Sequence, residues 1–142
     1  MFHFIKMVAL LLAFSSTAIK AQDVTLTVTG IALLKGNIIG GIYGADNNFP
    51  ERGMSIQKQV RSADTNTITM VFTNIPDGEY AIAVFHDEDK SGKMNKNFIG
   101  IPQEMFGFSN KATPGALSPP EFEEAKFKVS GDTEHSIALT EW

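Results

Sequence analysis

Short stretches in which apolar and polar residues alternate constrain the fold of this chain more than any other feature. In residues 24–29, valine and leucine alternate with threonine, and residues 67–73 repeat the pattern. A period of two places the apolar side chains on one face of a β-strand. Stretches with this habit are 24–29, 36–43, 67–73, 79–86, 122–129 and 136–139. We therefore predict an all-β domain, an antiparallel two-sheet sandwich of about seven strands.

Two long connections separate these stretches. The first, 45–66, is predicted to carry a strand of its own around 56–60, and the second runs from 91 to 120. Connections of this length in a compact domain are functional or disordered. Seven large apolar residues lie between Phe98 and Leu117, so we expect the second connection to be ordered and packed.

The N-terminal residues have the layout of a secretory signal peptide. Lys6 supplies positive charge, an apolar run covers residues 8–14, and small residues follow up to Ala21. The run is much shorter than the roughly 20 residues of a membrane-spanning helix. We predict a signal peptide over 1–21, with cleavage after Ala18 as the alternative, and one domain over 22–142 in the periplasm or outside the cell.

Composition excludes some function classes. The chain has 12 basic and 16 acidic residues, and removal of Lys6 and Lys20 makes the exported part more acidic still. An acidic exported domain is a poor candidate for binding nucleic acid. There is no cysteine, so neither a disulfide nor a lipid attached through cysteine is available. No second apolar segment is long enough to span a membrane.

The stretch "VFHDEDKSGKMN", residues 84–95, has oxygen-bearing side chains at every second position and then a glycine. A calcium loop takes ligands from alternate positions with glycine at the sixth. The predicted ligands are Asp87, Asp89, Ser91, the backbone carbonyl of Lys93, Asn95 and, folding back from further along, Glu104. The twelfth position, where a helix–loop–helix site has a bidentate glutamate, is Phe98. We therefore expect weak binding, in the millimolar range of extracellular modules.

A polar turn without metal is the competing interpretation, because Asp, Asn, Ser and Gly also build tight turns through hydrogen bonds to their own backbone.

A second set of residues is predicted to form a ligand-binding loop. Its members are His86, Phe106, Phe108, Ser109 and Asn110. His86 ends a predicted strand and Ser109 lacks the sequence of a nucleophile elbow.

The order of several motifs is similar to that of a known family. Upstream stands "IPDGEYAIAVFHD", then "GIP", "GFSN" and "PPEF". The matching residues are Pro76, Gly78 and Tyr80; His86, Asp87, Asp89 and Gly92; Gly100, Ile101 and Pro102; Gly107, Phe108, Ser109 and Asn110; and Pro119, Pro120, Phe122 and Ala125. The chain resembles domain-of-unknown-function family 2141, exported proteins of Gram-negative bacteria. Met105-Phe106 departs from the glycine and tyrosine that the family often has there. The resemblance implies a prealbumin-like or immunoglobulin-like Greek-key sandwich and no established activity.

The sequence leads to two hypotheses about function. The first is an exported cell-envelope module that binds a ligand or an envelope protein, or serves a structural role, with a calcium ion shaping its loop. The second is a periplasmic hydrolase that uses His86, Asp87 and Glu104. The sequence contains no complete catalytic set for the second. Convergence of those three residues in one pocket favours the enzyme, whereas carboxylates around a cation-sized gap favour the binding module.

Overall fold

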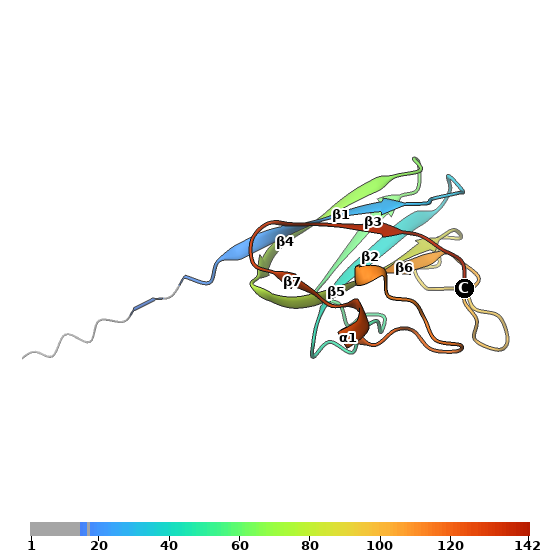
Figure 1. Cartoon of the computed structure of the whole chain (residues 1–142). Helices are drawn as coiled ribbons and strands as arrows, with labels where there is room; N and C mark the ends of the chain where they lie inside the picture. Colours follow the sequence, from blue (N-terminus) through green and yellow to red (C-terminus); the bar gives the residue numbers. More distant parts are fainter. Residues whose placement is uncertain (1–14, 17) are drawn as a thin grey trace, which may run out of the picture.

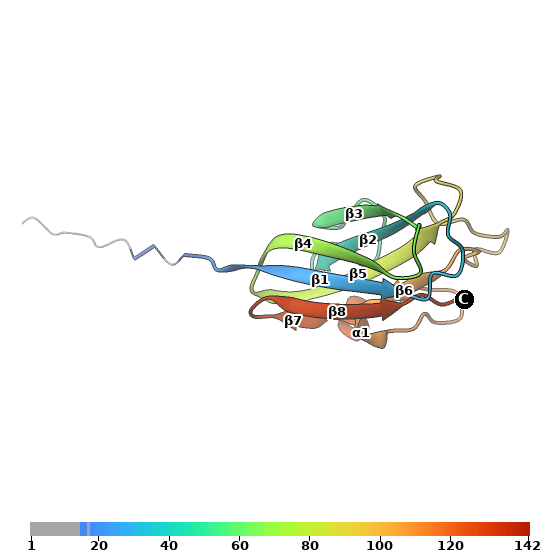
Figure 2. The ribbon, with the colours of Figure 1, turned by 90° about the horizontal axis from the view of Figure 1, so that it is seen from above.

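The computed structural model describes residues 15–16 and 18–142, which form two β-sheets and very little helix (Figures 1 and 2). One sheet has the strand order β4–β1–β8, and the other has the order β3–β2–β5–β6, with β7 also paired to β5. The strands are β1 (Ala21–Thr29), β2 (Asn37–Gly44), β3 (Gln57–Ser62), β4 (Ile68–Pro76), β5 (Gly78–Asp87), β6 (Phe106–Phe108), β7 (Phe127–Val129) and β8 (Thr133–Ala138). The helical segments are η1 (Ser109–Lys111) and α1 (Phe122–Ala125).

The alternation of residues 24–29 builds one wall of the core. The side chains of Val24, Leu26 and Val28 are fully buried, and the threonines between them face outward. Antiparallel pairing sets Leu26 opposite Met70, whose side chain is also fully buried. The other sheet contributes its own inward residues to the same cluster, among them Ile38, Ile42, Ile82 and Val84. The two sheets thus share a single apolar core, as in a β-sandwich.

The predicted strands over 24–29, 36–43, 67–73, 79–86 and 136–139 are confirmed within a few residues, as is the strand in the first long connection. The structure has eight strands where about seven are expected. The additional strand, β6, lies in the second long connection. The expectation that this connection is packed is wrong for three of its large apolar residues, since Phe98, Ile99 and Leu117 are exposed, whereas Phe106 is buried.

Two details of the prediction are wrong. The strands are not all antiparallel, because β8 pairs with β1 in parallel. The starts of the two strands lie side by side, with Val24 opposite Thr133. In the turn before β8, the carboxylate of Asp132 accepts a bond from the backbone N–H of Asp23 at 3.0 Å. The turn at Asp77 connects the two sheets, since β4 and β5 lie in different sheets.

Residues 122–129 do not form one strand. Helix α1 occupies Phe122–Ala125 and only Phe127–Val129 is extended. The backbone N–H of Glu121 donates to the carboxylate of Glu124 at 2.8 Å, and that of Lys126 donates to the carbonyl of Phe122 at 2.9 Å. These local bonds close a helical turn and override the alternation.

Most of the predicted signal peptide, 1–14 and 17, lies outside the described residues. Ala21, which precedes the predicted cleavage, is the exposed first residue of β1. Gln22 is buried, and its amide donates to Asp77 at 2.7 Å. Cleavage after Ala21 therefore removes one exposed residue from the strand. Among the residues that the structure describes, no helix has the length and apolarity needed to cross a membrane.

Candidate functional site

The acidic loop, residues 87–95, begins where β5 leaves the sandwich. Asp87 is the last residue of that strand and its side chain is buried. One of its carboxylate oxygens accepts bonds from the backbone N–H of Ser91 at 3.0 Å, and the other from that of Gly92 at 2.8 Å. These bonds curl the loop around the Asp87 carboxylate, with Gly92 at a φ of +75° that favours glycine.

Three carboxylates converge at this loop. Asp87, Asp89 and Glu104 each offer an oxygen that lies within 4.8 Å of the oxygens of the other two. Asp87 and Glu104 are buried, whereas Asp89 is exposed. Glu104 reaches the loop from a later part of the chain, as the sequence prediction required. Within the described part of the chain, no lysine or arginine nitrogen lies within 4.0 Å of these carboxylates.

Main-chain groups hold Glu104 in place. One oxygen accepts a bond from the N–H of Glu88 and the other from the N–H of Asn95, each at 3.0 Å. Glu104 therefore ties the beginning of the loop to its end. Burying a carboxylate costs less free energy when both of its oxygens accept hydrogen bonds in this way.

The amide of Asn95 lies between two of the carboxylates. Its nitrogen donates to Asp89 at 2.8 Å and to Glu104 at 3.3 Å. The bond from Asn95 is the largest cause that lowers the pKa of Asp89 below its ordinary value, followed by bonds from Ser91. The amide nitrogen occupies the position that a cation bridging Asp89 and Glu104 would take.

The remaining predicted ligands lie in the same loop. The hydroxyl of Ser91 lies 3.3 Å from a carboxylate oxygen of Asp87 and 2.9 Å from the carbonyl oxygen of Lys93, and it donates its single proton to one of them at a time. Three carboxylates, a hydroxyl, a carbonyl and an amide thus offer at least the six oxygens that calcium requires, all of them hard ligands. The donor set fits calcium once the Asn95 amide turns its oxygen toward the carboxylates.

A glycine allows β2 to begin close to the acidic loop. Gly36 has a φ of +70°, and a Cβ at this position would clash with the backbone of Asp87 and Glu88. Asn37, the first residue of β2, pairs with Asp87. The close approach fixes the start of the loop against the sandwich.

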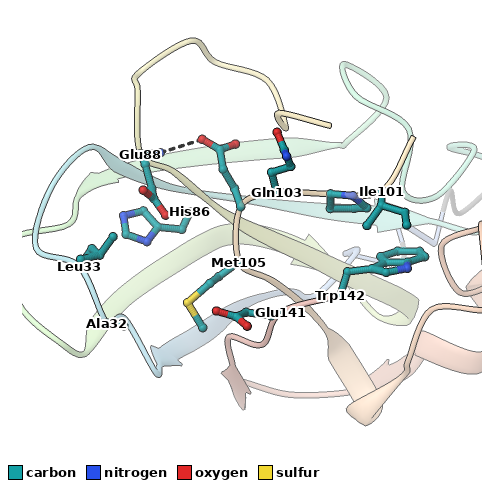
Figure 3. A pocket seen from close by; sticks show the side chains of 11 residues that line it. Ala32, Leu33, His86, Glu88, Ile101, Gln103, Met105, Glu141 and Trp142 are labelled. Atoms are coloured by element: carbon teal, nitrogen blue, oxygen red, sulfur yellow. Dashed lines mark hydrogen bonds between the residues drawn. The ribbon is translucent and has the colours of Figure 1, made fainter. Parts of the chain in front are cut away.

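His86 lies apart from the carboxylate cluster. It is fully buried on the inward face of β5, and its Nε2 bonds to the carbonyl of Lys35 at 2.7 Å. Because a carbonyl only accepts, Nε2 carries a proton, and Nδ1 has no hydrogen-bond partner among the described residues. His86 and Trp142 line opposite ends of a pocket of about 470 Å³ (Figure 3).

The residues that line this pocket do not form the catalytic arrangement that the hydrolase interpretation expects. His86 and Glu104 both line it, but the residues around it include no serine, threonine or cysteine. Both oxygens of Glu104 are engaged by backbone N–H groups. Asp87 and Glu104 converge with Asp89 instead, and His86 is not part of that cluster.

Two residues of the predicted ligand-binding loop have structural contacts. The hydroxyl of Ser109 is buried, accepts from the N–H of Ile82 at 2.8 Å and donates to the carbonyl of Ala125 at 2.6 Å. Asn110 donates through its side chain to the carbonyl of Glu124 at 3.1 Å. Neither residue lines the pocket described above or the groove described below.

Phe106 and Phe108 border a second hollow that sequence analysis did not identify. It is a groove of about 830 Å³ on the outward face of the five-stranded sheet, between the two long connections. Aromatic residues in both connections were the only sequence signal for it. Their common location depends on the pairing of β5 with β6.

Fold and site together define a small all-β protein whose acidic loop is anchored at the end of a central strand. The chain matches the family model described as "Uncharacterized protein conserved in bacteria (DUF2141)" over residues 26–138 and belongs to that family, which confirms the resemblance. Searches of curated proteins and of solved structures gave no match. The prealbumin-like, immunoglobulin-like and Greek-key descriptions accordingly stay predictions.

Proposed function

We propose that the chain is an exported binding module of the bacterial cell envelope, whose acidic loop takes a calcium ion. The observation that carries the proposal is the convergence of Asp87, Asp89 and Glu104 without a basic partner among the described residues. Like charges held together repel unless a cation or hydrogen bonds offset the repulsion. A divalent ion would offset it most fully.

Calcium would stabilise the conformation of the acidic loop and would take no part in a reaction. Asp87 ends β5, while Glu104 lies just before β6, so an ion bound to both would join the start of the acidic loop to the segment that leads into β6. The loop borders the groove on the outward sheet face, since Gly92, Met94 and Lys96 line it. Bound calcium would therefore stabilise one wall of that groove.

Thermal unfolding of residues 22–142 with calcium and with a chelator tests the metal. A ligand that binds only the folded state stabilises it by about 2.7 kcal/mol at one hundred times its Kd. The melting temperature should rise with calcium in the millimolar range, and less with magnesium, which prefers a smaller octahedral site. No rise at any millimolar concentration would remove calcium from the proposal.

Two variants make the test specific. Asp89→Asn should lose the calcium-dependent rise, because it removes one of the converging charges. Asp64→Asn is the matched control, since Asp64 is exposed and lies outside the loop. An equal loss in both variants would show that calcium acts on general surface charge.

Export is tested separately. Fractionation of cells that express the full chain should recover the protein outside the cytoplasm. Its first residue should be Gln22, or Ile19 if cleavage follows Ala18. Recovery of an uncleaved chain in the cytoplasm would contradict export without bearing on calcium.

A further inference from the structure

The groove on the outward face of the five-stranded sheet has the size of a small-molecule site. Its volume of about 830 Å³ lies within the range of roughly 300 to 1,000 Å³ typical of ligand pockets. The first long connection and the acidic loop border it on two sides. A Cβ built on Gly92 would lie 3.9 Å from Nη2 of Arg52, so the guanidinium reaches from one connection toward the other.

The strand register explains why this face is hollow. Lys58 of β3 pairs with Gly41 of β2, Gly41 with Ala83 of β5, and Ala83 with Phe108 of β6. Side chains of directly opposed residues point to the same face of a sheet. The two smallest members of the row stand in its middle, between a lysine and a phenylalanine. Ser55 and the ring of Tyr43 pack over Gly41, at 3.0 and 3.2 Å from where a Cβ would stand, so the floor of the groove is low at Ala83, beside Phe108.

A continuous row of aromatic rings lines the groove. Each ring contacts the next with centroids 5.3 to 5.9 Å apart. The row consists of Tyr43, Phe49, Phe108, Phe106 and Trp142, all of which border the groove. Tyr43 and Phe106 are buried beneath it, whereas Phe49 and Phe108 are half-buried and Trp142 is 37 % exposed. Accessible apolar area in the row is therefore supplied by Phe49, Phe108 and Trp142.

The charges around the groove have the opposite sign to the protein as a whole. Arg52, Lys58 and Lys96 border it, against one acidic residue, Glu51, although the chain carries a net charge of −4. Among the described residues, none of the three basic side chains forms an ion pair or a hydrogen bond. Their charge is available to a ligand, and a concave surface concentrates the field that they produce.

We propose that this groove binds a small amphiphilic anion, with an apolar or aromatic body on the aromatic row and a carboxylate or sulfonate among the three basic side chains. The inference deepens the proposed function, since it names the ligand class of the module, and it does not use the calcium ion. A neutral ligand would leave the cluster of positive charge unused. A cationic ligand would be repelled by it.

The single tryptophan reports on the groove directly. Titration of residues 22–142 with decanoate, below its micelle concentration, should change the fluorescence of Trp142 in a saturable way. Decylammonium and decanol have the same chain without the negative charge, and both should bind at least about tenfold more weakly. Naphthalene-2-sulfonate should compete with decanoate. Equal binding of the three decyl compounds, or no saturable response to decanoate, would overturn the proposal.

Variants separate the charge from the apolar row. Replacing Arg52, Lys58 or Lys96 by alanine should weaken decanoate binding by about two- to fivefold each, as expected for partly exposed ion pairs. Lys128→Ala is the matched control, because Lys128 lies on β7 and does not border the groove. An equal effect of the control would show that only the net charge matters.

Ala83→Leu tests the shape with the charges unchanged. A larger side chain at the low part of the floor should abolish binding of decanoate and of naphthalene-2-sulfonate. Circular dichroism and the melting temperature establish that the variant is folded. Ala83→Val provides a second, smaller obstruction at the same position if Ala83→Leu does not fold. Unchanged affinity in the folded variant would show that the ligand binds elsewhere.

The same titrations in calcium and in chelator keep the two proposals apart. Decanoate binding without any calcium-dependent rise in melting temperature would support the groove and contradict the metal site. A calcium-dependent rise without decanoate binding would support the metal site and overturn the groove.

Discussion

The hydroxyl of Ser109 donates a hydrogen bond to the backbone carbonyl of Ala125 at 2.6 Å. The same oxygen accepts from the N–H of Ile82 at 2.8 Å, in the middle of β5. Ser109 is fully buried and Ala125 is buried as well. One side chain therefore connects the central strand to helix α1 and satisfies a donor and an acceptor away from water.

Ser109→Ala should lower the free energy of unfolding by about 1 to 3 kcal/mol, because it leaves a buried N–H and a buried carbonyl without partners. Urea unfolding of residues 22–142 measures the change. Ser136→Ala is the control, since Ser136 is exposed on β8 and should give a change within about 0.5 kcal/mol. Equal stability of the two variants would contradict the bridging role.

Ser109 also shows the limit of sequence analysis for this protein. The alternation in 24–29 or 79–86 is a local pattern, and the strands that it predicts are present. The role of Ser109 depends on residues 27 positions before it and 16 positions after it. Nothing in the sequence near Gly107-Phe108-Ser109-Asn110 specifies those partners.

At the candidate sites too, features built from residues close in sequence were predicted, and features that depend on contacts between distant residues were not. The alternating oxygens of 87–95 identified most of the acidic loop, because they are close in sequence. The placement of Glu104 depends on the backbone N–H groups of Glu88 and Asn95. The groove depends on Ala83 lying beside Phe108, which only the strand register determines. Strand β6 is too short, at three residues, for its period to be recognised.

His135 should make stability depend on pH near neutrality. Burial lowers its pKa below the ordinary value of 6.5, and its neutral Nε2 accepts a bond from the N–H of Asn110 at 3.1 Å. As the pH falls below 6.5, the unfolded chain therefore binds the proton before the native protein does. The contribution of His135 is present above that pH and is lost progressively as the pH falls toward the lowered pKa.

His135→Gln tests this dependence, since glutamine offers an acceptor oxygen that does not titrate. Urea unfolding of both proteins between about pH 7.5 and about pH 5.5 should show a stability difference that narrows as the pH falls. A difference that stays constant across this range would exclude His135 as the source.

Asn95→Ala should raise the pKa of Asp89 toward its ordinary value. The amide of Asn95 is the largest cause of the lowered pKa, and Ser91 continues to supply part of the effect. Carboxyl resonances followed by NMR during an acid titration measure the change directly. Asn66→Ala, at an exposed position outside the loop, should leave Asp89 unaffected.

The lowered pKa of Asp89 also predicts how the stability of the native protein depends on pH. A carboxyl whose folded pKa is depressed stabilises the native state above its unfolded pKa, and the contribution is lost as the pH falls through the folded value. Asn95→Ala should accordingly make the domain unfold at a higher pH during acid titration. Unfolding at the same pH as the unmodified protein would show that the bond is not maintained in solution.

Gly36→Ala should be among the most damaging substitutions at any glycine of the described chain. The residue combines a φ of +70° with a close approach to the backbone of Asp87 and Glu88, so a methyl group meets both strain and a clash. Gly53 has a φ of +82° and open space around it, which makes Gly53→Ala the matched control for strain alone. The left-handed conformation costs an alanine about 1 to 2 kcal/mol, and overpacking adds about 1 to 3 kcal/mol. Urea unfolding should therefore show a loss of unfolding free energy at Gly36 that exceeds the loss at Gly53 by at least about 1 kcal/mol.

Because the clash lies where β5 enters the acidic loop, Gly36→Ala should also reduce any calcium-dependent rise in melting temperature, whereas Gly53→Ala should not. Equal losses at the two glycines would mean that the start of the loop moves away from β2 freely and that Gly36 does not fix its position.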